Sequence, residues 1–196
     1  MRRAAGILIA TILAMSGGEA AAVPVLAIDT DPGTDGIQSE RTVTLGSALS
    51  IDVLVFDVDA ADPLNAFEFE VDLDALVATA TGVVDGGFLG GPVFPLQEIV
   101  TPGSVFFSGV TLGPTGVAGA GILARIDLSA VGLGTTSLVL DRVILSAPGG
   151  REILAPGLQN GVLNVVAPVS PIPEPGAGLA FALGLGALAL GLRAAA

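Results

Sequence analysis

The stretch Asn65–Asp74, NAFEFEVDLD, alternates apolar and acidic residues along its length. The apolar residues share one parity: Phe67, Phe69, Val71 and Leu73. The acidic residues share the other: Glu68, Glu70, Asp72 and Asp74. Successive side chains of a strand point to opposite faces of its sheet, so this alternation predicts a half-buried β-strand.

The segments around it also predict strands. Residues 49–58, LSIDVLVFDV, are nearly continuous in apolar residues, as expected of a central, well-covered strand. Further strands are predicted at 104–112, 121–130, 136–146 and 160–167, with weaker candidates at 25–29, 41–45, 79–85 and 151–155. Within 121–130, one face is predicted to carry Ile122, Ala124, Ile126 and Leu128. The Gly- and Pro-rich segments 86–103 and 113–120 are predicted loops, and about ten short strands so spaced indicate one all-β domain, an antiparallel sandwich or jelly roll.

The order of these segments and their amino-acid sequences resemble those of the cohesin family. The similar features are LNAFEFEVDLDALV, the turn GVVDGGFL, the strand GSVFFSGV and the segment GAGILARIDLSAVGLGTTSLVL before a closing GVLNVV. The resemblance covers nearly all of residues 25–167 and implies a nine-stranded jelly-roll sandwich. In cellulosomal cohesins one sheet face grips a dockerin module, and no residue of this chain is assigned to that contact from the resemblance.

Composition excludes several kinds of chemistry. The chain of 196 residues has no Cys and no His, and all seven of its cations are Arg. A Ser-His-Asp triad, a Cys nucleophile and a His- or Cys-ligated zinc site are therefore excluded. With no disulfide available, a buried core must hold the fold. The net charge of −12 argues against nucleic acid as a partner, because nucleic acid needs a basic surface.

The face of the predicted strand 65–74 that carries the acidic residues leaves an enzymatic alternative open. Carboxylates at i and i+2 on a strand lie about 6.5–7 Å apart, within the range of about 5–9.5 Å that glycosidase pairs use. A sugar cleft would also need stacking aromatics, and the chain has neither Trp nor Tyr. The favoured interpretation is a solvent-facing strand edge whose charges oppose aggregation.

Two aspartate clusters are weak calcium candidates. The first is Asp29, Asp31 and Asp35, with Glu40 beyond, and the second is Asp57, Asp59 and Asp62. Counted from Asp29 as an EF-hand loop, the fifth position is Gly33 and the sixth, which must be Gly, is Thr34. The EF-hand is excluded, and each cluster is interpreted first as a turn in which Asp accepts backbone hydrogen bonds.

The amino-terminal segment has the pattern of a signal peptide. Arg2 and Arg3 precede an apolar stretch at 4–15, and small residues including Ala20 and Ala22 follow. Because the apolar stretch is shorter than the roughly 20 residues of a spanning helix, it predicts a cleaved signal peptide over 1–22, cut before Val23.

The carboxyl-terminal segment predicts a membrane helix. Residues 176–192 are apolar or small, and Arg193 follows them. Such a helix would be about 25 Å long, enough for a locally thinned bilayer, with the arginine on the cytoplasmic side. The triplet Pro173, Glu174 and Pro175 directly before it resembles the PEP-CTERM sorting signal, whose carriers are exported by Gram-negative bacteria that make extracellular polysaccharide. That resemblance implies exosortase as the processing partner, although family members usually carry several arginines where this chain has one.

These features predict three segments: a signal peptide at 1–22, a cohesin-like domain at 23–168 and a sorting signal at 169–196. The expected function is that of an exported, non-enzymatic surface or matrix protein. It would be anchored in the inner membrane, transiently or permanently, and would then reach the cell surface or the extracellular matrix. Its expected ligand is an exopolysaccharide or a protein, dockerin-like or other. The alternatives are a secreted carbohydrate-active enzyme using the acidic strand and a calcium-dependent adhesin.

Overall fold

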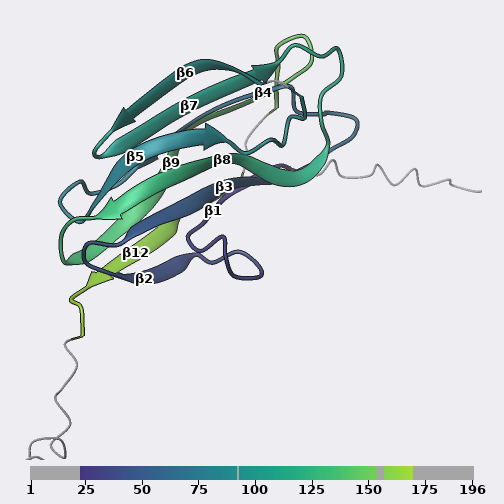
Figure 1. Cartoon of the computed structure of the whole chain (residues 1–196). Coiled ribbons are helices and arrows are strands. Elements are labelled where there is room, and N and C mark those ends of the chain that lie inside the picture. The colour runs from purple at the N-terminus through teal and green to yellow at the C-terminus, as the bar shows by residue number, and fades with distance from the viewer. Residues whose placement is uncertain (1–22, 92, 154–156, 170–196) are drawn as a thin grey trace, which may run out of the picture.

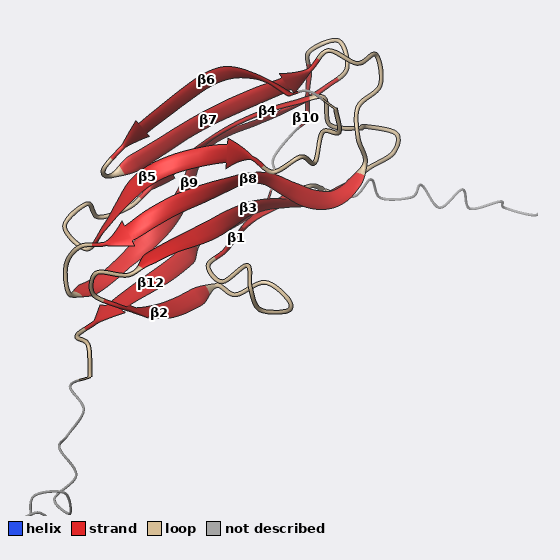
Figure 2. Cartoon of the chain, viewed as in Figure 1, coloured by secondary structure: helices blue, strands red, loops and turns tan. Residues whose placement is uncertain are grey.

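The described part of the chain is a β-sandwich. The computed structural model describes residues 23–91, 93–153 and 157–169, and this part contains strands and no helix (Figures 1 and 2). It consequently holds no helix long and apolar enough to span a membrane. The predicted signal peptide, with Ala20 and Ala22, lies outside the described residues, as do the Pro173–Pro175 triplet, the helix at 176–192 and Arg193.

One sheet has five strands. In spatial order they are β11 (Gly157–Gln159), β1 (Val25–Asp29), β3 (Ala48–Val58), β8 (Gly119–Ala130) and β5 (Ala78–Asp85). The predicted central strand is confirmed, because β3 pairs with β1 on one side and β8 on the other. Its side chains are buried at Leu49, Ile51, Val53 and Val55.

The second sheet has seven strands. Six run in the order β2 (Glu40–Thr44), β12 (Gly161–Val166), β9 (Gly134–Ala147), β4 (Ala66–Asp72), β7 (Ser104–Thr111) and β6 (Val93–Thr101), and β10 (Arg151–Ile153) also pairs with β9. Most pairs in the two sheets are antiparallel, as predicted. Two edge pairs, β1 with β11 and β2 with β12, are parallel. Their strands are far apart in the sequence, as a parallel pair requires, because a tight hairpin cannot join parallel strands.

The core lies between the sheets. The apolar parity of 65–74 points into it: Phe67, Phe69, Val71 and Leu73 are each at most 9% exposed. Phe69 is completely buried, and its ring centroid lies 5.9 Å from that of Phe67 and 6.2 Å from that of Phe107. Burial of these rings is a large part of the hydrophobic driving force that replaces the missing disulfides.

Two predictions about the second sheet are wrong. The segment 86–103 is not all loop, because β6 occupies Val93–Thr101. This strand is at the sheet's edge and mostly exposed, so it accommodates Pro95 and lacks the alternation that marks a half-buried strand. The acidic strand is not at an edge, since β4 pairs with β7 and β9, and its acidic residues lie on the outer face of an inner strand.

The predicted face of β8 is correct only in part. Ala124, Ile126 and Leu128 are buried, but Ile122 is partly exposed and Leu123 is buried instead. A β-bulge causes this change of phase, because Val53 pairs with Ala124 and Leu54 pairs with Ile122, which leaves Leu123 unpaired between them. The short strand β11 was not among the predicted strands.

Candidate functional site

An open groove of about 440 Å³ crosses the outer face of the seven-stranded sheet. Four adjacent strands, β9, β4, β7 and β6, supply its lining. We call it the outer groove, and its residues are Glu68, Glu70, Gln97, Ile99, Thr101, Ser104, Phe106 and Arg142. Its floor is the sheet itself, so hydrogen-bonded strands position the residues that line it.

Arg142 reaches this groove because β9 is bulged. Glu68 of β4 pairs with Ile144, and Glu70 pairs with Asp141, so two residues of β9, Arg142 and Val143, oppose Phe69 alone. Arg142 takes a positive φ of 47°, a conformation uncommon for a residue other than glycine. Bulges redirect side chains in this way and are frequent near functional sites. One sequence signal was available: the buried leucines change parity between Leu140 and Leu145.

Glu70 is held in place by two partners. Ser104 donates a hydrogen bond of 2.7 Å to Oε1 of Glu70, and Arg142 Nε lies 3.3 Å from its Oε2. Glu68 lines the same groove, whereas Asp74 leaves the row and accepts a 2.9 Å hydrogen bond from the backbone N–H of Leu76. The acidic residues therefore do not act as one uniform row, because only two of the four line the groove.

The groove also has an apolar part. Phe106 on β7 pairs in register with Ile99 on β6, so their side chains lie on the same face. Ile99 is 44% exposed, and Ile144, which is in register with Glu68 on the same sheet but outside the groove lining, is 45% exposed. Apolar side chains surrounded by carboxylates, an amide and a guanidinium have the composition of a protein-binding patch, with an apolar centre and a polar rim.

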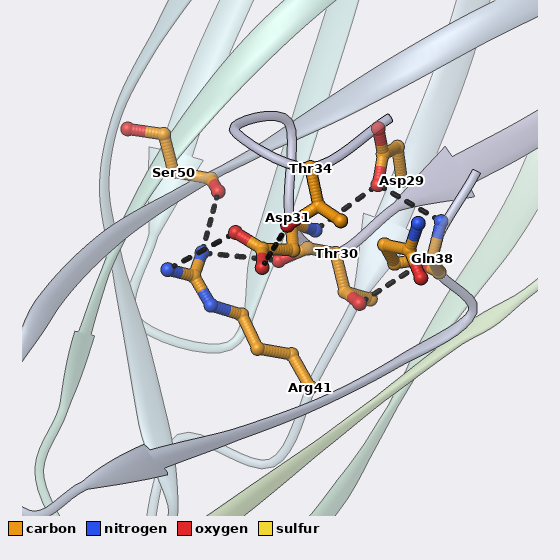
Figure 3. Close-up of polar contacts among 7 residues, drawn as sticks. All are labelled: Asp29, Thr30, Asp31, Thr34, Gln38, Arg41 and Ser50. Carbon is orange, nitrogen blue, oxygen red and sulfur yellow. Dashed lines mark hydrogen bonds and ion pairs between the residues drawn. The ribbon is translucent and has the colours of Figure 1, made fainter. Parts of the chain in front are cut away.

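The first aspartate cluster stabilises a turn (Figure 3). Oδ1 of Asp29 accepts hydrogen bonds from the backbone N–H groups of Asp31 at 3.0 Å and Gln38 at 3.1 Å. Asp31 lies 3.3 Å from Arg41 and accepts a hydrogen bond of 2.9 Å from Thr34. These contacts give the aspartates the hydrogen-bonding role expected of a turn.

The second cluster lies where β3 ends in the five-stranded sheet, at the end opposite to the turn that follows Asp29. Asp59 accepts a 2.8 Å hydrogen bond from the backbone N–H of Ala61, and Asp62 pairs with Arg151. Asp57 is exposed and has a positive φ of 56°. Across residues 23–91, 93–153 and 157–169, no three Asp or Glu side chains are grouped so that they could hold a metal ion.

An ion pair between the buried Asp52 and the exposed Arg125 lies on the outer face of the five-stranded sheet. Arg125 donates hydrogen bonds of 2.7 and 2.9 Å to the two carboxylate oxygens of Asp52, whose side chain is 4% exposed. These hydrogen bonds and the charge of Asp52 raise the pKa of Arg125 above its ordinary value. The two hydrogen bonds to both carboxylate oxygens hold the guanidinium as the partner of Asp52.

Comparison of this chain with solved structures finds cohesin domains among the similar folds. A non-cellulosomal cohesin from the archaeon Archaeoglobus fulgidus superposes with a TM-score of 0.58 at 14% identity, over 74% of this chain and 93% of its own. The seventh ScaB type I cohesin from Pseudobacteroides cellulosolvens gives a TM-score of 0.61 at 16% identity, over 78% and 97%. A chain of a type I cohesin–dockerin complex from Clostridium thermocellum gives 0.57 at 11% identity, over 74% and 99%.

No protein-family model and no curated protein matches the sequence. At these low identities, the likeness to solved structures establishes the fold and leaves the function open. The predicted cohesin-like sandwich is thereby confirmed as a fold, although the described residues form twelve strands where the resemblance implied nine.

Proposed function

We propose that this chain is a non-catalytic binding module that holds a protein partner, dockerin-like or other, against its outer groove. The observation that supports this proposal is the composition of the groove. Phe106 and Ile99 lie on the outer face of the sheet and are bordered by Glu68, Glu70 and Arg142. The likeness to a chain from a cohesin–dockerin complex supports a protein as the class of partner. The excess of acid over base in the groove favours a partner surface with basic and apolar groups.

The contacts of Glu70 weigh against the enzymatic alternative. This carboxylate is occupied by Arg142 and Ser104, which suits a fixed rim group better than an acid or base that must exchange protons with a substrate. Among the residues that line the groove, Phe106 is the aromatic one, so a sugar ring would find little to stack on. Exopolysaccharide is the second ligand class to test against the same groove.

We expect Phe106→Asp to weaken partner binding by roughly 30-fold or more, the effect of losing a central interface anchor. The measurement is capture of exported proteins and of exopolysaccharide from the producing cell by the immobilised full chain, followed by affinity determination for whatever is captured. The matched control is Val84→Asp, which changes a side chain 55% exposed on the other sheet. Equal losses for the two variants would contradict the assignment of the groove.

We also propose that the module is exported by a signal peptide at 1–22 from a Gram-negative cell, anchored in the inner membrane by the helix at 176–192, and sorted through Pro173, Glu174 and Pro175 by an exosortase. The strands support these boundaries, since β1 begins at Val25 and β12 ends at Val166. In this proposal the processed protein is carried to the cell surface or the exopolysaccharide matrix.

Processing predicts a specific mass for the mature protein. Intact mass spectrometry of protein from its native host is expected to find a chain that starts at Val23 and ends near Pro173–Pro175. Removal of the helix is expected because recognition of the triplet would direct cleavage next to it. A chain that still runs to Ala196 would leave a membrane-anchored module and exclude the sorting step.

A further inference from the structure

The end of the sandwich at which β12 finishes is built from apolar loops. We call this end the β12 pole, and it comprises residues 44–47, 73–77, 101–104, 131–133 and 166–169. Backbone hydrogen bonds join these segments: Leu45 to Val166 at 2.8 Å, Leu73 to Gly103 at 2.9 Å and Val131 to Val77 at 2.9 Å. Figure 1 shows the β6–β7 and β8–β9 turns at the same end as the last turn of the described chain.

Large apolar side chains are exposed at this pole. Leu76 is 83% exposed and Leu133 is 58% exposed, so neither contributes to the core between the sheets. The others are Leu45 at 38%, Val131 at 49%, Val166 at 45% and Val169 at 96% exposed. Loop tips of a soluble domain are ordinarily polar, so exposed apolar residues gathered from separate loops indicate a surface that another apolar phase covers.

The two ends of the sandwich differ sharply in charge. Within the β12 pole the one charged residue is Asp74, which is exposed and whose Oδ1 accepts a hydrogen bond from the backbone N–H of Leu76. The opposite end carries exposed or partly exposed acidic groups at Asp57, Asp59 and Asp85, together with Asp62, which pairs with Arg151. In a chain of net charge −12, this asymmetry means that one end can enter an apolar environment at far lower desolvation cost than the other.

We propose that the β12 pole rests on a lipid bilayer, with Leu76 and Leu133 in its interfacial region. This rests on the proposed membrane helix at 176–192. The seven residues that follow Val169, up to Gly176, span at most about 25 Å, which keeps the pole close to the bilayer surface. The absence of Lys and Arg among the residues of this pole favours contact through apolar burial, and so a zwitterionic lipid surface suffices.

This placement has a consequence for the outer groove. The strands of both sheets lie along the axis that ends at the β12 pole (Figure 2). With that pole on the membrane, the sheets would stand away from it, and the outer groove, on the outer face of the seven-stranded sheet, would be directed along the membrane. A partner could therefore reach the part of the groove formed by Glu68, Gln97, Ile99 and Phe106 while the chain is still anchored, whereas Thr101 and Ser104 belong to both the groove and the pole. The Pro173–Pro175 triplet would be held near the bilayer surface, where a membrane enzyme acts.

The test uses single-cysteine variants, which the cysteine-free chain makes possible. The full chain is reconstituted in phosphatidylcholine vesicles, and a polarity-sensitive fluorophore is attached to Leu76→Cys, or to Leu112→Cys as the matched control. Leu112 is 73% exposed and follows β7 at the opposite, acidic end. We expect brominated phosphatidylcholine to quench the Leu76 label about threefold more than the Leu112 label, since only the first would lie among acyl chains.

Equal, weak quenching of the two labels would overturn the proposal. A third label at Leu185→Cys reports the proposed helix separately. If Leu185 is quenched and Leu76 is not, the anchor stands and the contact of the pole fails. If Leu76 is quenched and Leu185 is not, the pole binds lipid by itself and the anchor fails. A blue shift at Leu76 that follows protein concentration and ignores brominated lipid would identify a second copy of the chain as the occupant, which also overturns the proposal.

Discussion

Replacing Phe69 by alanine is expected to lower the free energy of unfolding by about 4 kcal/mol. Phe69 is fully buried at the middle of β4, and its ring packs against those of Phe67 and Phe107. The substitution removes a large apolar surface from the core and leaves a cavity between two sheets whose strands cannot close over it. A loss of this size approaches the whole stability of many domains of this length.

The measurement is urea denaturation of the full chain in a mild non-ionic detergent. Far-UV circular dichroism is the suitable probe, because the chain has no Trp or Tyr to report by fluorescence. The matched control is Phe94→Ala, which truncates the same side chain where it is 50% exposed on edge strand β6. We expect the control to cost below about 1 kcal/mol, and similar losses at the two positions would mean that β4 is not the centre of the core.

Replacing Gly132 by alanine is expected to cost about 3 kcal/mol, and more if the loops cannot separate. A Cβ atom at Gly132 would meet the backbone carbonyl oxygen of Leu76. The same glycine donates a backbone hydrogen bond of 3.1 Å to Val77. Because the obstacle is backbone rather than a flexible side chain, relief requires the 73–77 and 131–133 segments to move apart.

Gly87→Ala is the matched control. Gly87 has a positive φ of 83°, but nothing lies near its missing Cβ, so this substitution carries only backbone strain of about 1 kcal/mol. Urea denaturation of the two variants separates steric collision from strain. If Gly132→Ala were as mild as Gly87→Ala, the close approach of the two loops, and with it the arrangement of the β12 pole, would be wrong. Circular dichroism of the folded state would show whether either variant changes the sheet content.

Several features were predictable because they depend on neighbouring residues. The parity of 65–74 predicted which side chains of β4 enter the core, and the apolar run 49–58 predicted a covered central strand. The turn interpretation of Asp29 agrees with its two backbone hydrogen bonds. The cohesin-like fold was implied by a resemblance to the cohesin family in the order and residues of these segments.

The outer groove was not predictable in this way. The acidic residues of β4 were expected at a sheet edge, because no local pattern says which strands flank a given strand. Arg142 was expected within a regular strand, and a bulge against Phe69 brings it beside Glu70. β6 was interpreted as loop because an exposed edge strand has no alternation to detect, yet it supplies one side of the groove.

The sequence by itself determined an all-β, disulfide-free and acidic domain, and it determined which face of β4 is buried, because alternation and composition are properties of adjacent residues. Tertiary structure alone decided the neighbours of β4, the placement of Arg142 against Glu70 and the gathering of Leu45, Leu76 and Leu133 at one pole. These features depend on pairing between strands far apart in the chain, and one inserted residue in a ladder shifts the side chains that follow it to the opposite face.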